Sequence, residues 1–454
     1  MEWWIRSGTS PDGPNLSGEF VTTSSWPSRS RPSSPELVEE TSHWTVGPSA
    51  SWEDWRAPVG SRWALQDIEW FLPTHTVRCD PARTRSIPRA PEDLADLPVP
   101  GSSRGDVTLA AVLDFTATDA WLVMRDGVIV DEQYRAGMSA GSSHLLLSVT
   151  KSVVGTVAGI LADRGLFATS DLVTRYCPEL GESGYQGATI RDVLDMRSGV
   201  KFDEAYADPA SDVRRLEEAI RRQPGMEHEP PGLHRFLGGL SAARPHGGRF
   251  EYRSCETDVL GWVCERASGA LMPELISELI WRPMGAEHDA SLLCDTFGAT
   301  IHDGGLSGSL RDVARFGQLV LDAGRVAGHQ IAPRGWFADI WSVDGQVRQA
   351  FATSPAEDSM PGGWYRNQFW VTPGRHGDLL LCMGIFGQLI RVDPATRTVM
   401  VKLSSWGSPQ DPACLFDTLL ACDAVATALS GRTGLHGPRF GPSTGRSVVT
   451  GRGE

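Results

Sequence analysis

Lysine is the residue type in which this sequence is most clearly poor. The chain has 454 residues, 42 of them lysine or arginine, and only Lys151, Lys201 and Lys402 are lysines. Arginine keeps its proton inside a protein, whereas a partly buried lysine can lose one. Each lysine is therefore a candidate for a task that needs a neutral amine.

Three further absences exclude broad classes of protein. The net charge is −14 and there is no basic run, so we expect no nucleic-acid or membrane partner. No stretch approaches the roughly 18 consecutive apolar residues of a membrane span. Residues 1–20 lack the apolar stretch of a secretory signal, so the expected location is cytoplasmic.

Patterns typical of disulfide frames and metal sites are also missing. The eight cysteines include no Cys-x-x-Cys pair, which predicts reduced, mostly buried thiols. The eleven histidines contain no His-Glu-x-x-His pattern. We therefore expect neither a metal nor an organic cofactor.

Composition divides the chain into three parts. Residues 1–50 are rich in Ser, Pro and Gly and are predicted to be disordered, and residues 431–454 resemble a similar flexible tail. Residues 51–430 contain no linker and no internal repeat. This middle part is predicted to be one large domain.

Strand patterns occur near both ends of that domain. Residues 120–134 alternate around Arg125-Asp126-Gly127, a hairpin signal, and residues 378–406 contain three more strand patterns. The stretch between them is mainly helical. The expected helices cover residues 148–165, 189–199, 212–222, 255–269, 271–285 and 309–324. The pattern predicts an α+β fold, with one antiparallel sheet built from both chain ends, flanking helices and a mainly helical second lobe.

Two Ser-x-x-Lys pairs compete as a catalytic pair. Ser198 and Lys201 lie where a helix ends at Gly199, so no continuous helix holds their side chains on one face. Ser148 and Lys151 lie at the start of a very apolar helix, and residues three apart on a helix are neighbours. Lys151 Nζ should therefore reach Ser148 Oγ.

The start of that helix suits nucleophilic chemistry. Its positive end disfavours an ammonium and favours an oxyanion, and burial lowers a lysine pKa to roughly 7–8 in known cases. We expect a neutral Lys151 that takes the Ser148 proton, while the Ser148 N–H donates to an oxyanion. The alternative is an N-capping Ser148 and a solvated Lys151. A charge at the start of a central apolar helix needs a reason, which favours the catalytic interpretation.

A third serine and two later segments complete the candidates. Ser139 stands in a Gly-x-Ser-x-Gly pattern, but the helix follows too late for a nucleophile elbow, so a loop serine is expected. Tyr252-Arg-Ser254 precedes a helix and could exchange protons with a lysine, or could be an ordinary tyrosine with a capping serine. Gly384 and Ile385 could complete an oxyanion hole, or could form a bulged core strand.

Taken in order, these motifs resemble a known superfamily. The segments "SVTK", "YRS" and "CMGIFGQ" are similar to the three motifs of the serine β-lactamase and penicillin-recognising proteins. The similarity is greatest to the class C-like branch and the nylon-oligomer (6-aminohexanoate-dimer) hydrolases, and it covers about residues 52–425. It implies the β-lactamase-like fold for the middle of the chain.

The resemblance also implies a role for each matched residue. Ser148 would be the nucleophile, Lys151 its general base, Tyr252 the proton shuttle to the leaving group and Ser254 the link between them. The N–H groups of Ser148 and Ile385 would form the oxyanion hole. The implied substrate contacts are Tyr206, Glu217, Gly384 and Phe386. Tyr206 matches a tyrosine that closes over a linear amide.

Departures from the family motifs narrow the range of substrates that we expect. Ser254 replaces the β-lactamase Asn, and Cys382-Met383-Gly384 replaces Lys-Thr-Gly, which removes the cation that holds a β-lactam carboxylate. Phe386 stands where the nylon-oligomer enzyme has His.

We therefore predict a serine hydrolase that cleaves a small linear amide or carboxylic ester through an acyl-Ser148 intermediate. Its expected partner is that small molecule alone, and the family resemblance favours a homodimer. Two alternatives stay open, an acyltransferase on the same scaffold and a non-catalytic binding or sensing protein.

Overall fold

The computed structural model describes residues 44–45, 61–221 and 229–430. Apart from Trp44 and Thr45, the predicted disordered leader lies outside the described residues, as does the predicted tail, residues 431–454. All eight cysteines are described; none forms a disulfide, and six of them are buried. The expectation that the thiols are mostly buried is thus confirmed.

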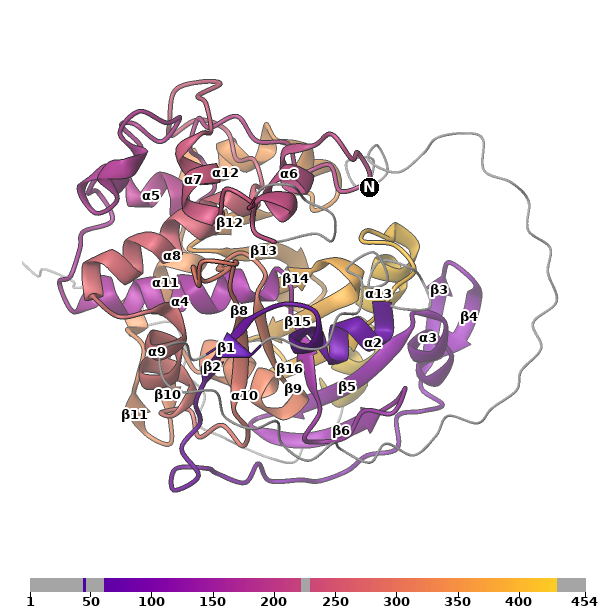
Figure 1. Cartoon of the computed structure of the whole chain (residues 1–454). Coiled ribbons are helices and arrows are strands. Elements are labelled where there is room, and N and C mark those ends of the chain that lie inside the picture. The colour runs from indigo at the N-terminus through magenta and orange to yellow at the C-terminus, as the bar shows by residue number, and fades with distance from the viewer. Residues whose placement is uncertain (1–43, 46–60, 222–228, 431–454) are drawn as a thin grey trace, which may run out of the picture.

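A seven-stranded antiparallel sheet is the centre of the molecule (Figure 1), with strand order β12-β13-β14-β15-β16-β5-β6. Its early strands are β5 (Thr118–Arg125) and β6 (Val128–Tyr134). The late ones are β12 (Trp364–Arg366), β13 (Phe369–Gly374), β14 (Gly377–Gly384), β15 (Gln388–Asp393) and β16 (Thr398–Ser404). Because β16 pairs with β5, the two chain ends share one sheet, as the sequence predicts.

The predicted hairpin between β5 and β6 is confirmed. Asp126 and Gly127 have φ angles of 50° and 77°. A two-residue turn with both φ angles positive follows the right-handed twist of the flanking strands, and Asp-Gly is a preferred pair for it.

Helices cover both faces of this sheet. On one face lie α4 (Val149–Asp163) and α10 (Leu310–Leu321). At Gly317 of α10 an added Cβ would lie 2.5 Å from Val399 Cγ1, so glycine permits this close packing. The other face meets α13 (Pro412–Ser430), whose Asp423 pairs with Arg391 of β15 over 2.7 Å, and α3 (Leu109–Phe115) packs against α13.

A mainly helical lobe lies on the far side of α4 (Figure 1). It includes α5 (Ile190–Leu194), α6 (Asp212–Ala219), α7 (Leu233–Gly238), α8 (Ser254–Ser268) and α12 (Gly345–Ala352). Helix α8 packs directly on α4. All of α4 from Val149 to Leu161 is buried, so this helix is the central one that its apolar sequence predicts.

A second sheet was not expected from the sequence. Its order is β1-β2-β8-β9-β7. The strands are β1 (Trp44–Thr45), β2 (Thr74–Val77), β7 (Ser143–Leu145), β8 (Ala290–Leu293) and β9 (Leu306–Ser309). Strands of two to four residues are too short to show a period-two pattern, which explains the omission. Strand β7 leads directly to Ser148, so this sheet helps to position the candidate nucleophile.

Shorter elements complete the described chain. The helices are α2 (Ser61–Gln66), α9 (Met272–Ile276) and α11 (Arg334–Trp341), and a π-helical segment η5 (Ser277–Trp281) continues α9. Two small ribbons pair β3 (Pro98–Ser102) with β4 (Gly105–Thr108) and β10 (Arg325–Val326) with β11 (His329–Gln330). Single turns are η2 (Ile68–Trp70), η3 (Val173–Arg175), η4 (Pro178–Leu180), η6 (Pro355–Asp358) and η7 (Ile385–Gly387).

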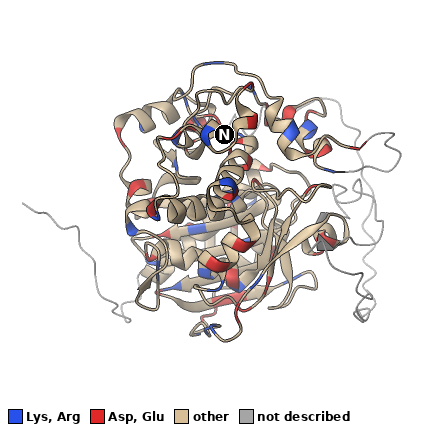
Figure 2. Cartoon of the chain, turned by 60° about the vertical axis from the view of Figure 1, so that its left-hand side comes forward, with Lys and Arg blue, Asp and Glu red and all other residues tan. Residues whose placement is uncertain are grey.

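Helix α13 is long and apolar enough to cross a membrane by length and composition, with a mean hydropathy of 1.5. It nevertheless carries two acidic residues that bind the rest of the fold. Asp417 accepts hydrogen bonds from the backbone and side chain of Ser103, and Asp423 pairs with Arg391. These contacts attach α13 to the domain. In the view of Figure 2, acidic and basic residues are interspersed along the described ribbon.

Candidate active site

Ser148 lies where β7 passes into α4. The preceding Leu147 has a φ of 49°, a left-handed conformation that costs a non-glycine residue about 1–3 kcal/mol. Ser148 itself has a φ of −65° and makes no side-chain capping hydrogen bond to α4. The N-cap alternative is therefore wrong. The strained turn presents the Ser148 side chain to a pocket instead.

The side chain of Lys151 reaches Ser148, as the helical spacing predicts. Its Nζ lies 3.0 Å from Ser148 Oγ, 3.1 Å from Ser254 Oγ and 2.6 Å from the carbonyl oxygen of Asp303. Only 1% of Lys151 is exposed, so the alternative of a solvated lysine is also wrong.

The three neighbours of this amine differ in what they can donate. The Asp303 carbonyl oxygen only accepts, and Ser254 donates its hydroxyl proton to Glu204 over 2.5 Å. A neutral amine gives its two N–H groups to these two oxygens. Ser148 is then the one neighbour of the three that can donate to Nζ. The arrangement suits proton transfer from Ser148 to Lys151.

The pKa of this amine, however, is raised. Burial lowers the pKa of Lys151 and is the largest single influence, but Tyr252, Asp303, Glu204 and Asp258 raise it, and the result lies above the ordinary value. The expectation of a lowered pKa is wrong, because acidic groups from three separate segments surround the amine. The three N–H groups of an ammonium match its three oxygen neighbours.

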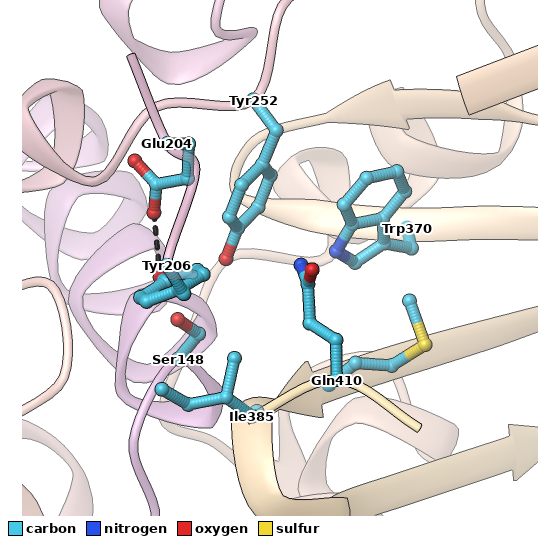
Figure 3. A pocket seen from close by; sticks show the side chains of 9 residues that line it. Ser148, Glu204, Tyr206, Tyr252, Trp370, Ile385 and Gln410 are labelled. Atoms are coloured by element: carbon cyan, nitrogen blue, oxygen red, sulfur yellow. Dashed lines mark hydrogen bonds between the residues drawn. The ribbon is translucent and has the colours of Figure 1, made fainter. Parts of the chain in front are cut away.

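Glu204 is the main site residue that the sequence interpretation missed. It accepts hydrogen bonds from the Ser254 backbone N–H over 2.9 Å and from the Ser254 hydroxyl. It also accepts one from the Tyr206 hydroxyl over 2.6 Å, which Figure 3 shows. Burial raises the pKa of Glu204, and the Lys151 charge opposes that rise. In the sequence Glu204 is one of several acidic residues in a short polar stretch, so nothing distinguishes it from a solvated charge.

Tyr252 occupies the position predicted for the proton shuttle. Its ring stacks on Trp370 with centroids 5.1 Å apart, and Lys151 Nζ lies 5.4 Å from the ring centre. Burial raises the pKa of Tyr252, while the Lys151 charge and a hydrogen bond with Ser148 lower it, and burial dominates. Tyr252 thus lies beside the Lys151 amine as a group that can donate a proton to a leaving atom.

The end of β14 closely approaches the chain before Ser148. A Cβ added at Gly384 would lie 2.7 Å from the carbonyl oxygen of Leu146, so glycine is required here. The residue after Ile385, Phe386, has a φ of 58°, and its N–H donates to the Pro409 carbonyl over 2.9 Å. Strained residues thus flank both segments predicted to form the oxyanion hole.

These groups open into one pocket with an empty volume of about 390 Å³ (Figure 3). Its wall is mostly aromatic and apolar. The lining residues are Ser148, Glu204, Tyr206, Tyr252, Trp370, Met383, Gly384, Ile385 and Gln410. Trp370, Met383 and Gln410 were not predicted, because an aromatic or methionine in a strand usually indicates core and Gln410 lies in a connecting loop.

Two predicted substrate contacts do not line this pocket. Glu217 forms an ion pair with Arg214 over 2.9 Å. The Phe386 side chain is only 3% exposed and packs in the core, so this residue adjoins the site through its backbone alone. Tyr206 and Gly384, in contrast, lie in the lining.

The competing residues are separated from the pocket chemistry. Ser198 donates to the buried Glu256, whereas Lys201 is exposed. Ser139 is an exposed loop serine hydrogen-bonded to Ser142, as predicted. Lys402 is buried beside the Thr116 carbonyl, and burial lowers its pKa to about 7. A poorly protonated lysine thus does occur in this chain, but away from the pocket lining.

Comparison with known proteins agrees with this geometry. The β-lactamase family model matches residues 108–422, a span that contains all three motifs. The chain belongs to the β-lactamase family. It is a serine hydrolase of this family.

Individual relatives show which members of the family this chain is similar to. A 6-aminohexanoate-dimer hydrolase of Paenarthrobacter ureafaciens is 35% identical over 383 residues, which cover 82% of this chain and 94% of the relative. A solved structure of a Bacillus anthracis protein assigned as a 6-aminohexanoate-dimer hydrolase has a TM-score of 0.75 at 26% identity, covering 84% of this chain and 97% of its own. The hydrolase EstCE1 shares the fold at 18% identity, with a TM-score of 0.54, covering 70% of this chain and 98% of its own.

Proposed function

We propose that this enzyme cleaves small linear amides or carboxylic esters through an acyl-Ser148 intermediate, with Lys151 as the proton acceptor. The observation that carries the proposal is the set of three contacts at Lys151 Nζ. Two of the contacting oxygens, those of Ser254 and Asp303, only accept an N–H of the amine. The third is the Ser148 hydroxyl oxygen, 3.0 Å from Nζ, which can donate its proton. No metal or organic cofactor enters this mechanism.

Acylation proceeds in two proton transfers. Ser148 Oγ bonds to the substrate carbonyl carbon as its proton passes to the amine form of Lys151, and the N–H groups of Ser148 and Ile385 bind the oxyanion. The carbon–nitrogen or carbon–oxygen bond then breaks. Tyr252 donates its hydroxyl proton to the leaving atom and regains one from the Lys151 ammonium. The acyl group remains on Ser148.

Deacylation uses the same groups with water as the nucleophile. Water gives a proton to the amine of Lys151 as its oxygen attacks the acyl carbon. Collapse of the second tetrahedral intermediate releases the carboxylic acid, and Ser148 Oγ recovers its proton from Lys151. Ser254 and Glu204 hold Lys151 in place through both halves of the reaction.

The pocket wall indicates an acyl chain that carries no negative charge. Trp370, Met383 and Ile385 offer apolar contacts, and the lining of this pocket contains neither arginine nor lysine. An anionic group on the substrate would therefore lose hydration without gaining a cationic partner there. Short aliphatic or aryl acyl groups fit this wall better than a β-lactam carboxylate.

Location and assembly remain proposals. The eight unpaired cysteines support a reducing compartment, in agreement with the cytoplasmic location expected from the sequence. A homodimer is proposed from the family resemblance, and a measurement of molar mass in solution tests it.

A substrate panel with active-site labelling tests the proposed function. We expect turnover of p-nitrophenyl esters and linear amides, much weaker action on D-amino acid peptides and a chromogenic cephalosporin, and a fluorophosphonate adduct on the peptide that contains Ser148. Labelling of another serine, or none, would contradict the proposal. Product that partitions toward an added alcohol or amine at the expense of hydrolysis would favour an acyltransferase.

The charge of Glu204 predicts a pH effect. Because Lys151 must lose its proton to act as a base and its pKa is raised, kcat/KM should rise with pH into the alkaline range. Glu204 is one cause of that raised pKa. Glu204→Gln keeps an oxygen acceptor but removes the charge, so the rising limb of kcat/KM should move to lower pH. Stopped-flow or steady-state rates on one ester across pH check this.

Asp203→Asn provides the control for that shift. Asp203 precedes Glu204 and is exposed, so removal of its charge should leave the rising limb of kcat/KM at the same pH. If the rising limb of kcat/KM stays at the same pH in Glu204→Gln, another group sets the pKa of Lys151.

A further inference from the structure

The loop between β8 and β9 runs beside the candidate base. Its Asp303 carbonyl oxygen, 2.6 Å from Lys151 Nζ, makes the shortest of the three contacts to that amine. The loop continues into β9, where the Leu306 carbonyl accepts the Leu146 N–H over 2.8 Å and the Leu306 N–H donates to Thr150 Oγ1 over 3.1 Å. One end of the loop is thus bonded to the residues on either side of Ser148.

Asp258 of α8 holds the part of the loop that lies next to Lys151. This carboxyl group is fully buried, and its Oδ1 accepts the backbone N–H groups of His302 over 2.9 Å and of Asp303 over 3.1 Å. Asp258 lies one helical turn after Ser254, which contacts Lys151 directly. Helix α8 therefore positions the amine twice, through the Ser254 hydroxyl and through the loop.

The His302 ring is seated against the same face of α8. A Cβ added at Gly261 would lie 2.1 Å from His302 Cγ, so glycine is what admits the ring. His302 Nε2 lies 2.7 Å from Thr300 Oγ1 and 3.3 Å from Glu265 Oε1. Residues 254, 258, 261 and 265 recur at the three-to-four-residue spacing of one helix face. All four face Lys151 or the loop beside it.

We propose that Asp258 is a positioning residue for the Lys151 amine. By fixing the His302 and Asp303 N–H groups, it places the Asp303 carbonyl so that it takes one N–H of Lys151. The lone pair of the deprotonated amine then points at Ser148. This inference rests on the proposed function, because it assumes that Lys151 accepts the Ser148 proton.

Asp258 acts here mainly as a hydrogen-bond acceptor, and of the four groups that raise the pKa of Lys151 it has the smallest influence. Burial, followed by the Asp303 carboxylate, raises the pKa of Asp258 well above its usual range. A neutral carboxyl and an amide have similar shapes, and both offer one oxygen acceptor. Asparagine should therefore replace Asp258 in this role, whereas a side chain without an oxygen should not.

Two substitutions test this distinction. Asp258→Ala should lower kcat by about 10²-fold with KM nearly unchanged, the size of effect produced by a misplacement of roughly 1 Å. Asp258→Asn should keep kcat within about threefold and move the rising limb of kcat/KM less than Glu204→Gln does. If Asp258→Ala does not fold, Asp258→Leu, which fills more of the volume without an acceptor, replaces it.

The experimental results that would refute this inference differ from those that would refute the proposed function. Wild-type enzyme that fails to label at Ser148 with a fluorophosphonate refutes the proposed function itself. Wild-type labelling together with equally fast labelling of Asp258→Ala refutes only the positioning role. An Asp258→Asn variant slowed more than tenfold would also refute it, because the charge would then matter.

Asp312 supplies a matched control for general damage. It is a fully buried carboxyl on α10 that also accepts two consecutive backbone N–H groups, those of Glu287 over 2.7 Å and His288 over 3.0 Å. Its contacts lie outside the pocket lining. Asp312→Ala should lower the melting temperature as Asp258→Ala does, but leave kcat and the pH profile of the folded enzyme unchanged. An equal loss of kcat in both variants would attribute the effect to stability alone.

Discussion

Ser148→Ala is expected to abolish turnover of every substrate that the wild-type enzyme cleaves. Without the hydroxyl no acyl intermediate forms, and loss of a serine nucleophile lowers kcat on the order of 10⁶-fold. The pocket wall and the N–H groups near Ser148 remain, so substrate binding should persist. The fold should survive, since Ser148 makes no cap to α4.

Steady-state kinetics on one ester and one linear amide measure this loss. A thermal melt and binding of a substrate analogue confirm that the variant is folded. Ser139→Ala is the matched control, because Ser139 is an exposed loop serine in a nucleophile-like sequence pattern. Residual kcat within tenfold of wild type in Ser148→Ala, or a strong loss in Ser139→Ala, would move the nucleophile elsewhere.

Lys151→Arg should lower kcat/KM by roughly 10³-fold or more, because general base catalysis contributes about 10²–10⁴-fold and arginine does not give up its proton. The substitution keeps the positive charge that Glu204 and Asp303 surround. It therefore separates proton transfer from electrostatic stabilisation. A guanidinium is also larger than an ammonium, so the first turn of α4 must adjust.

The rate of fluorophosphonate labelling at Ser148 gives a second measure for this variant. Labelling reports the nucleophilicity of Ser148 without product release, and it should slow in parallel with kcat/KM. Lys201→Arg is the matched control, since Lys201 is exposed and belongs to the other Ser-x-x-Lys pair. Full activity of Lys151→Arg would remove the proton-acceptor role.

The charge of the resting base is where the structure most changes the interpretation. Helix position and burial both favour a neutral Lys151, but the acidic groups of Glu204, Asp258 and Asp303 and the phenol of Tyr252 together outweigh them. An ammonium at rest satisfies all three oxygen neighbours. The enzyme then pays a deprotonation cost before each acylation, which is why an alkaline rise in kcat/KM is expected.

Long elements with a clear period are predictable from this sequence. The apolar run of α4, the Asp126-Gly127 hairpin and the late strands β14 to β16 all have local signals, and the structure confirms them. The second sheet has no such signal. Its strands of two to four residues are defined by partners far along the chain, for example β7 by β9.

The residues of the site also differ in whether a local sequence pattern predicts them. The pairing of Ser148 with Lys151 follows from a three-residue spacing within one helix, so it can be predicted locally. Glu204, Trp370 and Gln410 come from three distant segments, and each belongs to a common residue class in an ordinary context. Their membership of the site depends on how loops and strands meet, which no local pattern records.

By itself, the sequence determined the helix that carries Ser148 and Lys151, the strand patterns near both chain ends and the order of the three motifs. These features depend on spacing and periodicity within short windows. The tertiary structure alone decided the raised pKa of Lys151 and the direction in which its lone pair points. Both depend on acidic groups and a carbonyl oxygen from residues 204, 258 and 303, and Coulomb and hydrogen-bond energies depend on distance in space and not on separation along the chain.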